Sequence, residues 1–226
     1  MQLIAVPAIF TLARGQLLLI FVLLGLISAC GVIDKPVRSS VYDFGPGPAP
    51  AQAAPILGRG GLPPLVLADI DAVGTLDGTA VLYRLAYADS NLLRPYAQSR
   101  WSAPPPQLVR QRLREQWGRE RVVLSPGENA ALSRSALPGT AAPRMLRLEL
   151  EEFSHFFDSP AQSAGLLRLR ATLLEITPAG EQLLAQRSFT LRQNAASNDA
   201  PGGVRALAAA TDAAAQEISL WLGQQR

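Results

Sequence analysis

The sequence has very few of the side chains that most often carry out chemistry. Its 226 residues include one cysteine, Cys30, and one histidine, His155. A single cysteine cannot form a disulfide within the chain, and a single histidine cannot build a multi-histidine metal site. The chain also has no Gly-x-Ser-x-Gly motif and no glycine-rich phosphate-binding loop. Its composition therefore argues against the common hydrolase and nucleotide-binding classes.

An excess of charge of either sign is also missing. There are 21 basic and 18 acidic residues, which give a formal net charge of +3. Since nucleic-acid-binding proteins usually carry a marked basic surplus, we expect no nucleic acid among the partners. The mature length is enough for a single domain, which is the default interpretation for a chain of this size.

An apolar run near the N-terminus indicates where the mature protein resides. Residues 17–27 are uninterrupted and apolar, follow Arg14, and lead into Ile27-Ser28-Ala29-Cys30. An apolar run this short is typical of a secretory signal, and small residues before a cysteine are typical of a lipobox. We expect cleavage before Cys30 and anchoring by a diacylglycerol and an acyl chain on that cysteine. A plain transmembrane anchor is the alternative, but Pro7 and Arg14 interrupt the preceding apolar stretch.

Gly31, the residue after the cysteine, indicates which of the two membranes the lipid anchor enters. Gly31 stands where an aspartate commonly means retention at the inner membrane of Gram-negative bacteria, so we expect the periplasmic face of the outer membrane. The predicted organisation is a signal peptide with lipobox over 1–29, a lipidated tether over 30–40, and one domain over 41–226 that includes a Gly/Pro/Ala-rich loop at 45–64.

In the first half of the domain, short apolar runs predict strands. The strand patterns lie at residues 41–44, 65–69, 80–86 and 121–125, whereas 91–98 indicates a short helix or an irregular segment. We expect the strands at 65–69 and 80–86 to pair across a turn at 76–78. A helix is predicted from Ser102 onward, because prolines are tolerated in a first turn and Val109, Leu113 and Trp117 form an apolar stripe.

In the second half, alternation of apolar and polar residues predicts three consecutive strands. They lie at residues 145–153, 165–175 and 182–191, with a hairpin turn at 177–180 between the last two. A long alanine-rich helix follows over 204–222, with an apolar face made of Val204, Leu207, Thr211, Ala214, Ile218 and Trp221. The predicted fold class is α/β, a single layered domain in which helices cover a mixed β-sheet.

A set of motifs connects these elements to a known family. The lipobox is followed by Tyr42-Asp43-Phe44, Val81-Leu82-Tyr83-Arg84, Pro95-Tyr96, Arg100-Trp101-Ser102-Ala103-Pro104-Pro105 and a final helix that ends near Trp221. In these motifs the chain resembles the ABC-type transport auxiliary lipoproteins, the PqiC/YmbA-like family, over essentially its whole mature length. It departs from the family's usual pattern at Phe44, where leucine is common, and in the longer Gly/Pro/Ala stretch that follows.

The resemblance implies a fold, a location and partners. The fold would be similar to anticodon-binding-like domains, and the role would be non-enzymatic. Members of the family look like periplasmic partners of transporters that carry an MCE-domain component and move phospholipid or other lipid between membranes. The implied partners here are the MCE-domain, permease and ATPase components of such an ABC transporter, with several copies of this chain around a ring-shaped partner. No cofactor is implied beyond the covalent lipid on Cys30.

Candidate catalytic groups are few and poorly placed in the sequence. His155 has Ser154 and Asp158 nearby, but a triad needs an oriented third partner and an oxyanion hole, so we predict a partly exposed loop histidine. The carboxylates of Glu149, Glu151 and Glu152 could act as an acid–base pair. Alternation places the first two on the wet face of a strand, where we expect them to pair with Arg168 and Arg170.

Two groups of residues are candidates for contact with a partner or a membrane. The family signature and a phenylalanine cluster supply Tyr83, Arg84, Arg100, Trp101, Phe156 and Phe157. For each of these a structural role within the fold is the competing interpretation. The arginine-rich stretch 100–121 is a further candidate for acidic surfaces, with an ordinary solvated helix face as the alternative.

Two other functions stay open at the level of sequence. A membrane-anchored hydrolase or cell-wall-enzyme activator predicts a deep polar pocket around His155 or several converging carboxylates. A carrier of soluble lipid predicts an apolar cavity that is large enough for an acyl chain. A docking protein instead predicts a filled core and flat surfaces.

Overall fold

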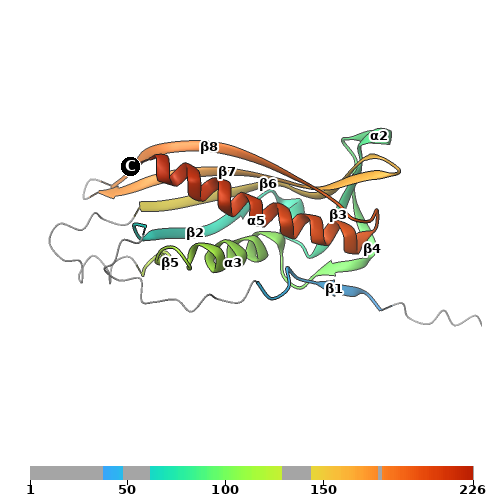
Figure 1. Cartoon of the computed structure of the whole chain (residues 1–226), viewed down its shortest axis with the longest axis horizontal. Coiled ribbons are helices and arrows are strands. Elements are labelled where there is room, and N and C mark those ends of the chain that lie inside the picture. The colour runs from blue at the N-terminus through green and yellow to red at the C-terminus, as the bar shows by residue number, and fades with distance from the viewer. Residues whose placement is uncertain (1–37, 48–61, 129–143, 178–179, 226) are drawn as a thin grey trace, which may run out of the picture. The chain divides into compact units, whose positions relative to one another are not determined.

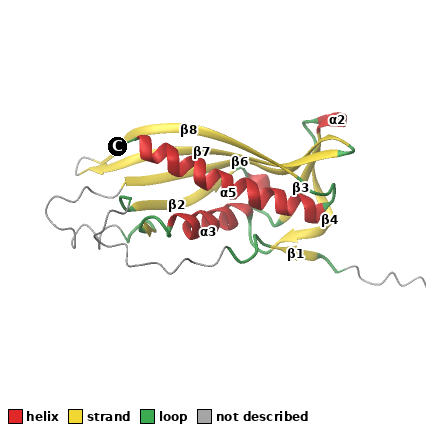
Figure 2. Cartoon of the chain, viewed as in Figure 1, coloured by secondary structure: helices red, strands yellow, loops and turns green. Residues whose placement is uncertain are grey.

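The computed structural model describes residues 38–47, 62–128, 144–177 and 180–225 (Figure 1). The expected signal peptide, nearly all of the tether and most of the loop at 45–64 therefore lie outside the described residues. Ser39–Arg226 form one of the two compact units into which the chain divides. This unit contains one mixed sheet with helices against it, so the predicted α/β class is confirmed (Figure 2).

Within the described residues, eight strands make up the sheet. They are β1 (Ser40–Tyr42), β2 (Leu65–Ala72), β3 (Ala80–Leu85), β4 (Leu93–Trp101), β5 (Val123–Leu124), β6 (Arg144–Ser159), β7 (Gln162–Thr177) and β8 (Gly180–Asn194). The helices are α2 (Ala86–Asp89), α3 (Pro105–Trp117) and α5 (Ala200–Gln224), with a 3-10 helix, η2, at Gly74–Leu76. The strand order is β1-β4-β3-β6-β2-β5, and β7 and β8 continue from the other edge of β6.

The long strand β6 organises the sheet, because two short strands share one of its edges. β2 runs parallel to its first half, where Leu65 pairs with Arg144, and β3 runs parallel to its second half, where Tyr83 pairs with His155. The prediction that β2 and β3 pair with each other is therefore wrong. A strand of 16 residues offers enough edge for both, and η2 lies in the connection that carries the chain from one half to the other.

The predicted meander is confirmed as β6–β7–β8. Antiparallel pairing continues almost without interruption from one end of these strands to the other. The expected hairpin turn joins Thr177 to Gly180, where the Thr177 hydroxyl donates to the Gly180 carbonyl at 2.8 Å. Gly180 has φ +120, a left-handed conformation that glycine adopts without steric cost.

Most of the segment predicted as a short helix or irregular structure at 91–98 is instead part of a strand, β4, which begins at Leu93. It lies between β3, to which it is antiparallel, and β1, to which it is parallel. The sequence hides this strand because Pro95 and several exposed polar residues break the alternation. Pairing with two neighbours, a tertiary effect, stabilises it.

Helices α3 and α5 contact each other and cover one face of the sheet (Figure 2). The predicted stripe on α3 is confirmed, since Val109, Leu113 and Trp117 are buried in the main core. α5 begins earlier than predicted, because the Asp199 side chain accepts a hydrogen bond from the backbone N–H of Gly202 and caps the helix.

Helix α5 packs unusually close to the sheet. An added Cβ at Gly165 on β7 would lie 2.5 Å from the backbone carbon of Ala206. A larger residue would therefore separate the two layers. The alanine-rich face of α5, including the fully buried Ala210 and Ala214, permits this short separation.

Candidate functional site

Arg84, from the family signature, joins three elements of the fold. Its guanidinium donates to both carboxylate oxygens of Glu152 on β6, each at 3.0 Å. It also donates to the carbonyl oxygens of Ser90 and Asn91, after α2, at 3.2 and 3.3 Å. The Arg84 side chain is only 18% exposed, so this bidentate ion pair is partly shielded from water. The contacts fix the segment after α2 against β6.

Arg100 and Trp101 close the end of β4. The Arg100 guanidinium donates to two carbonyl oxygens of its own strand, at 2.7 and 2.8 Å. Trp101 is buried, and its ring packs edge-on against Phe44 at 5.7 Å and tilted against Phe153 at 5.6 Å between centroids. Phe44, which follows β1, is thereby held on the main core.

The phenylalanine cluster divides between the two faces of the sheet. Phe157 is buried, with its ring 4.3 Å from that of His155 and 6.3 Å from that of Tyr83. Phe156 is half-buried on the other face, under the guanidinium of Arg192 at 5.0 Å. The six candidate residues thus have partners inside this chain, and their contact with a partner protein or a membrane stays a prediction.

His155 lies within β6 and has no exposed surface, so the prediction of a partly exposed loop histidine is wrong. β6 continues to Ser159 because β3 and β7 pair with its second half. The Nδ1 atom of His155 lies 2.9 Å from the Tyr96 hydroxyl on β4, and the Nε2 atom lies 2.8 Å from the Ser163 hydroxyl on β7. The histidine therefore joins three strands.

Hydrogen bonds run in a series from Tyr96 through His155 and Ser163 to Asn198. The direction of each bond in this series follows from donor and acceptor chemistry. The Asn198 amide nitrogen donates to the Pro160 carbonyl at 3.2 Å, which leaves its oxygen to accept from the Ser163 hydroxyl at 2.5 Å. Since that hydroxyl has one proton, Nε2 of His155 must donate to Ser163. Nδ1 then accepts from the Tyr96 hydroxyl, and the imidazole is neutral with both nitrogens satisfied.

Burial favours the neutral form of both ionisable groups in this hydrogen-bonded series, His155 and Tyr96. Desolvation lowers the pKa of His155 to about 4, and the carboxylate of Asp199 opposes this only in part. Desolvation also raises the pKa of the Tyr96 hydroxyl above its ordinary value, with further contributions from Tyr83 and Asp199. Both groups are therefore neutral at physiological pH.

This arrangement is a structural network. Ser163 is 4% exposed, and its proton points to Asn198 instead of to the imidazole that would have to accept it in nucleophilic catalysis. Across residues 38–47, 62–128, 144–177 and 180–225, no cluster of three or more histidine, cysteine or carboxylate side chains could hold a metal ion.

The face of the sheet opposite the helices carries a ladder of ion pairs. As predicted, Arg170 pairs with Glu149 at 3.4 Å and with Glu151 at 2.5 Å, and Arg168 lies 3.8 Å from Glu151. A bulge in β6 between Leu150 and Glu152 brings consecutive glutamates to this face. These carboxylates are therefore paired with cations and do not converge in a pocket.

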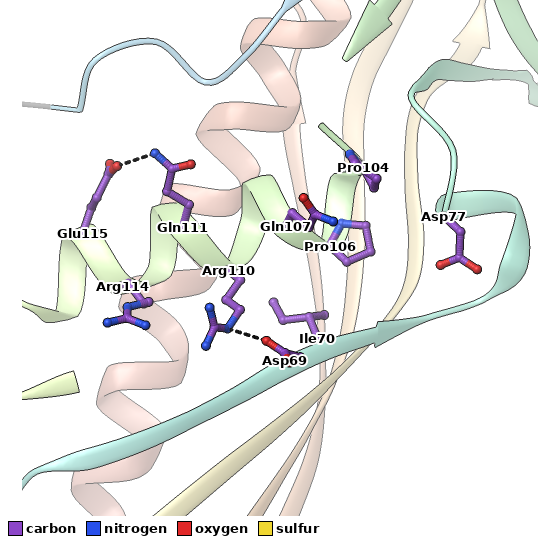
Figure 3. Close-up of a pocket in the computed structure, with 10 residues that line it drawn as sticks. All are labelled: Asp69, Ile70, Asp77, Pro104, Pro106, Gln107, Arg110, Gln111, Arg114 and Glu115. Atoms are coloured by element: carbon purple, nitrogen blue, oxygen red, sulfur yellow. Dashed lines mark hydrogen bonds and ion pairs between the residues drawn. The ribbon is translucent and has the colours of Figure 1, made fainter. Parts of the chain in front are cut away.

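A groove of about 900 Å³ lies between α3 and the edge of β2 (Figure 3). Its lining is mixed, with the side chains of Gln107, Gln111, Arg110, Arg114 and Glu115 from α3, Asp69 and Ile70 from β2, and Asp77, Pro104 and Pro106 at the connections. The groove is open to solvent, and charged and amide groups stand among its apolar surface, so it offers hydrogen bonds to a partner but does not enclose an acyl chain.

A bulge in β2 shapes the groove. Leu67 pairs with Leu146 and Ile70 with Leu148, so Ala68 and Asp69 together oppose a single residue of β6. The guanidinium of Arg110 donates to the carbonyl oxygens of Leu67 and Ala68, at 3.4 and 3.3 Å.

Two arginines therefore stand beside this edge. Arg110 also lies 3.3 Å from the carboxylate of Asp69, whose side chain is 89% exposed, and Arg114 donates to the Ser125 hydroxyl at 2.6 Å. The arginine-rich stretch at 100–121 could be recognised in the sequence, but the position of Arg110 and Arg114 beside β2 could not be predicted. Arg110 binds carbonyl oxygens at a bulge, and a bulge has no signature in the sequence.

Comparison with known proteins identifies the family. A family model described as ABC-type transport auxiliary lipoprotein component matches residues 42–219. The chain belongs to this family. The match covers almost the whole described domain, confirms the resemblance seen in the sequence, and places this auxiliary lipoprotein in a family that is not a known family of enzymes.

Solved structures share the fold of the auxiliary lipoprotein at low sequence identity. A crystal structure of a Xanthomonas campestris protein, assigned to the family model DUF330, has 16% identity and a TM-score of 0.60, and the match covers 82% of this chain and 98% of that one. A second, uncharacterized protein has 16% identity and a TM-score of 0.56, with 82% and 99% covered. A search of curated proteins finds no match.

None of the described helices of the auxiliary lipoprotein, α5 included, is both long enough and apolar enough to cross a bilayer.

Proposed function

We propose that this auxiliary lipoprotein is held on the periplasmic face of the outer membrane and docks the periplasmic, MCE-domain component of an ABC transport system there. The transported substrate would be phospholipid or another lipid. The observation that carries the proposal is the family match over residues 42–219, to which the lipobox at Cys30 adds a means of attachment.

The start of the folded domain supports a short tether. β1 begins at Ser40 and pairs with β4, and Tyr42 and Phe44 pack against the main core. About ten residues would then separate the lipid on Cys30 from the fold, with a reach of at most about 33 Å. Under this proposal the domain works close to the membrane surface, where a component that spans the periplasm would meet it.

The interior of the domain favours docking over the two alternatives. A hydrolase would need an accessible base, whereas His155 is fully buried and satisfied on both nitrogens. A lipid carrier would need an enclosed apolar cavity, whereas the groove between α3 and β2 is open to solvent and carries charged and amide side chains. The main core is filled by leucines from the sheet and the buried faces of α3 and α5.

The test compares three forms of the full-length lipoprotein in its own cells: the wild type, Cys30→Ala and Gly31→Asp. Membranes are separated by density, and partners are recovered by crosslinking and affinity purification. We expect the wild type in the outer membrane together with an MCE-domain protein, Cys30→Ala as a precursor or in the soluble fraction, and Gly31→Asp in the inner membrane.

Each part of the proposal fails on a different result. A wild-type protein that recovers no transporter component contradicts the docking function. Membrane attachment of Cys30→Ala at wild-type levels contradicts lipidation. Gly31→Asp serves as the matched control, because it keeps the lipid and changes only the signal for the destination.

A further inference from the structure

Among the described residues, strand β2 has a pairing partner along only a short part of one of its edges. β6 pairs with one edge along its length, and β5 pairs with the other only at Leu65 and Val66. Among the residues that the structure describes, no strand continues β5 along the rest of that edge. Backbone N–H and C=O groups on the free edge of a strand are a ready template for another extended chain.

The groove lies beside this free edge. Arg110 already caps the carbonyl oxygens of Leu67 and Ala68 at the bulge, so the available edge begins at Asp69 and ends with the strand at Ala72. At about 3.3 Å per residue, this length accommodates roughly four residues of an extended peptide. Figure 3 shows the side chains of α3 along the opposite side of the same groove.

The end of the groove at Arg114 fits a peptide that carries a carboxylate, whereas Asp77 lies at the other end (Figure 3). Gln107 and Gln111 are exposed and can donate to and accept from a peptide backbone. Arg110 has a carboxylate partner in Asp69. Arg114, in contrast, bonds to the neutral Ser125 hydroxyl and takes part in none of the ion pairs formed by the described side chains. An acidic side chain would complement its charge.

We propose that the open edge of β2 and the groove beside it bind, by strand addition, an extended peptide segment of the periplasmic transport component that carries a carboxylate side chain. The segment adds to β2 at Asp69–Ala72, and its carboxylate pairs with Arg114. This inference rests on the proposed docking function and names the surface that performs it. Main-chain hydrogen bonds supply affinity in this mode of recognition, and the side chains of the groove supply specificity.

The first test fills the groove in the full-length lipoprotein. Gln111→Trp places a large ring in the groove from an exposed position on α3, and Gln216→Trp makes the same change at an exposed position on α5 that does not line it. We expect Gln111→Trp to lower recovery of the transport component by about tenfold, the effect of losing a significant contact, and Gln216→Trp to leave recovery unchanged. Both variants must keep the wild-type melting temperature, and Gln107→Trp replaces Gln111→Trp if the latter unfolds.

Two further measurements address the peptide and its charge. Arg114→Glu should lower recovery by a similar factor, whereas Arg114→Lys, which keeps the charge, should retain most of it. A photo-crosslinking amino acid at position 107 should label one continuous stretch of about ten residues or fewer in the transport component, a length set by the extended geometry.

Failure of this inference is distinguishable from failure of the proposed function. If the wild type recovers the transport component and Gln111→Trp recovers it equally, or if Gln216→Trp loses it as well, the groove is not the docking site. Labels spread over several separate segments of the partner would overturn strand addition. If the wild type itself recovers no transport component, the docking function has failed first, and this inference fails with it.

Discussion

Replacement of Gly165 by alanine tests the close packing of α5 on the sheet. Gly165 lies on β7 opposite His155 on β6, beneath the peptide that joins Ala206 to Leu207. An added Cβ would lie 2.5 Å from the Ala206 carbon, 2.6 Å from the Leu207 nitrogen and 2.8 Å from the Ala206 oxygen. Ordinary contacts between such atoms are about 3.5–4.0 Å. Because all three atoms belong to the backbone of a long helix, no side-chain rotation can relieve the overlap.

The helix must therefore move away from β7 by about 1 Å, which loosens its buried alanines as well. Overpacking of this kind costs about 1–3 kcal/mol and occasionally more. A glycine-to-alanine change also restricts the unfolded chain, which returns about 0.4–1 kcal/mol where the new residue fits. We expect a net loss of about 2 kcal/mol in the free energy of unfolding, which is a drop of about 4–8 °C in melting temperature for a domain of this size.

Urea unfolding followed by circular dichroism measures the loss. Gly223→Ala, in the last turn of α5, is the matched control, since an added Cβ there meets no atom within 4 Å. It should leave stability unchanged or raise it slightly, because alanine favours the helix. If Gly165→Ala is as stable as Gly223→Ala, the close approach of α5 to β7 does not exist in solution and the packing argument is wrong.

Three further predictions concern charge. Because the pKa of His155 is lowered to about 4 in the folded state, the unfolded chain binds a proton first as the pH falls. The stability that the neutral imidazole contributes is complete above about pH 6.5 and declines toward pH 4, by up to about 3 kcal/mol. His155→Gln should remove this part of the pH dependence, as measured by urea unfolding at a series of pH values. Asp212→Ala leaves the buried Arg112 without its bidentate partner and should cost about 3–5 kcal/mol in chemical denaturation, whereas replacement of both residues by apolar ones should cost much less. The exposed pair of Arg170 and Glu149 should show a coupling of no more than about 1 kcal/mol in a double-mutant cycle, and less at high salt.

The parts of the fold that depend on local pattern could be predicted. Strands β6, β7 and β8 lie side by side in sequence order, so the alternation of leucine with charged residues is enough to place them and to pair Glu149 and Glu151 with their arginines. The ends of these strands were harder to predict. β6 continues past Phe153 because of the strands beside it, where the sequence no longer alternates.

The parts that depend on distant contacts could not be predicted. The sequences of β2 and β3 do not indicate that each strand pairs with a different half of β6, and they are equally compatible with a hairpin in which the two pair with each other. The burial of His155 depends on that arrangement, since its partners Tyr96 and Ser163 come from strands on either side. The position of Arg110 depends on a bulge, a feature of the pairing between strands that neither strand shows by itself.

The division of β6 between two upstream strands has a consequence for how the protein reaches its destination. β1 to β5 precede β6 in the chain, yet β2 has its main partner on that strand, and β3, which also pairs with β4, joins β6 along its other edge. A chain that crosses a membrane N-terminus first would expose these apolar strands before the C-terminal meander arrives to receive them, a condition that favours aggregation. If the chain is exported as proposed, β2 would stay without its main partner until the meander, with its local contacts, supplies the template on which it pairs.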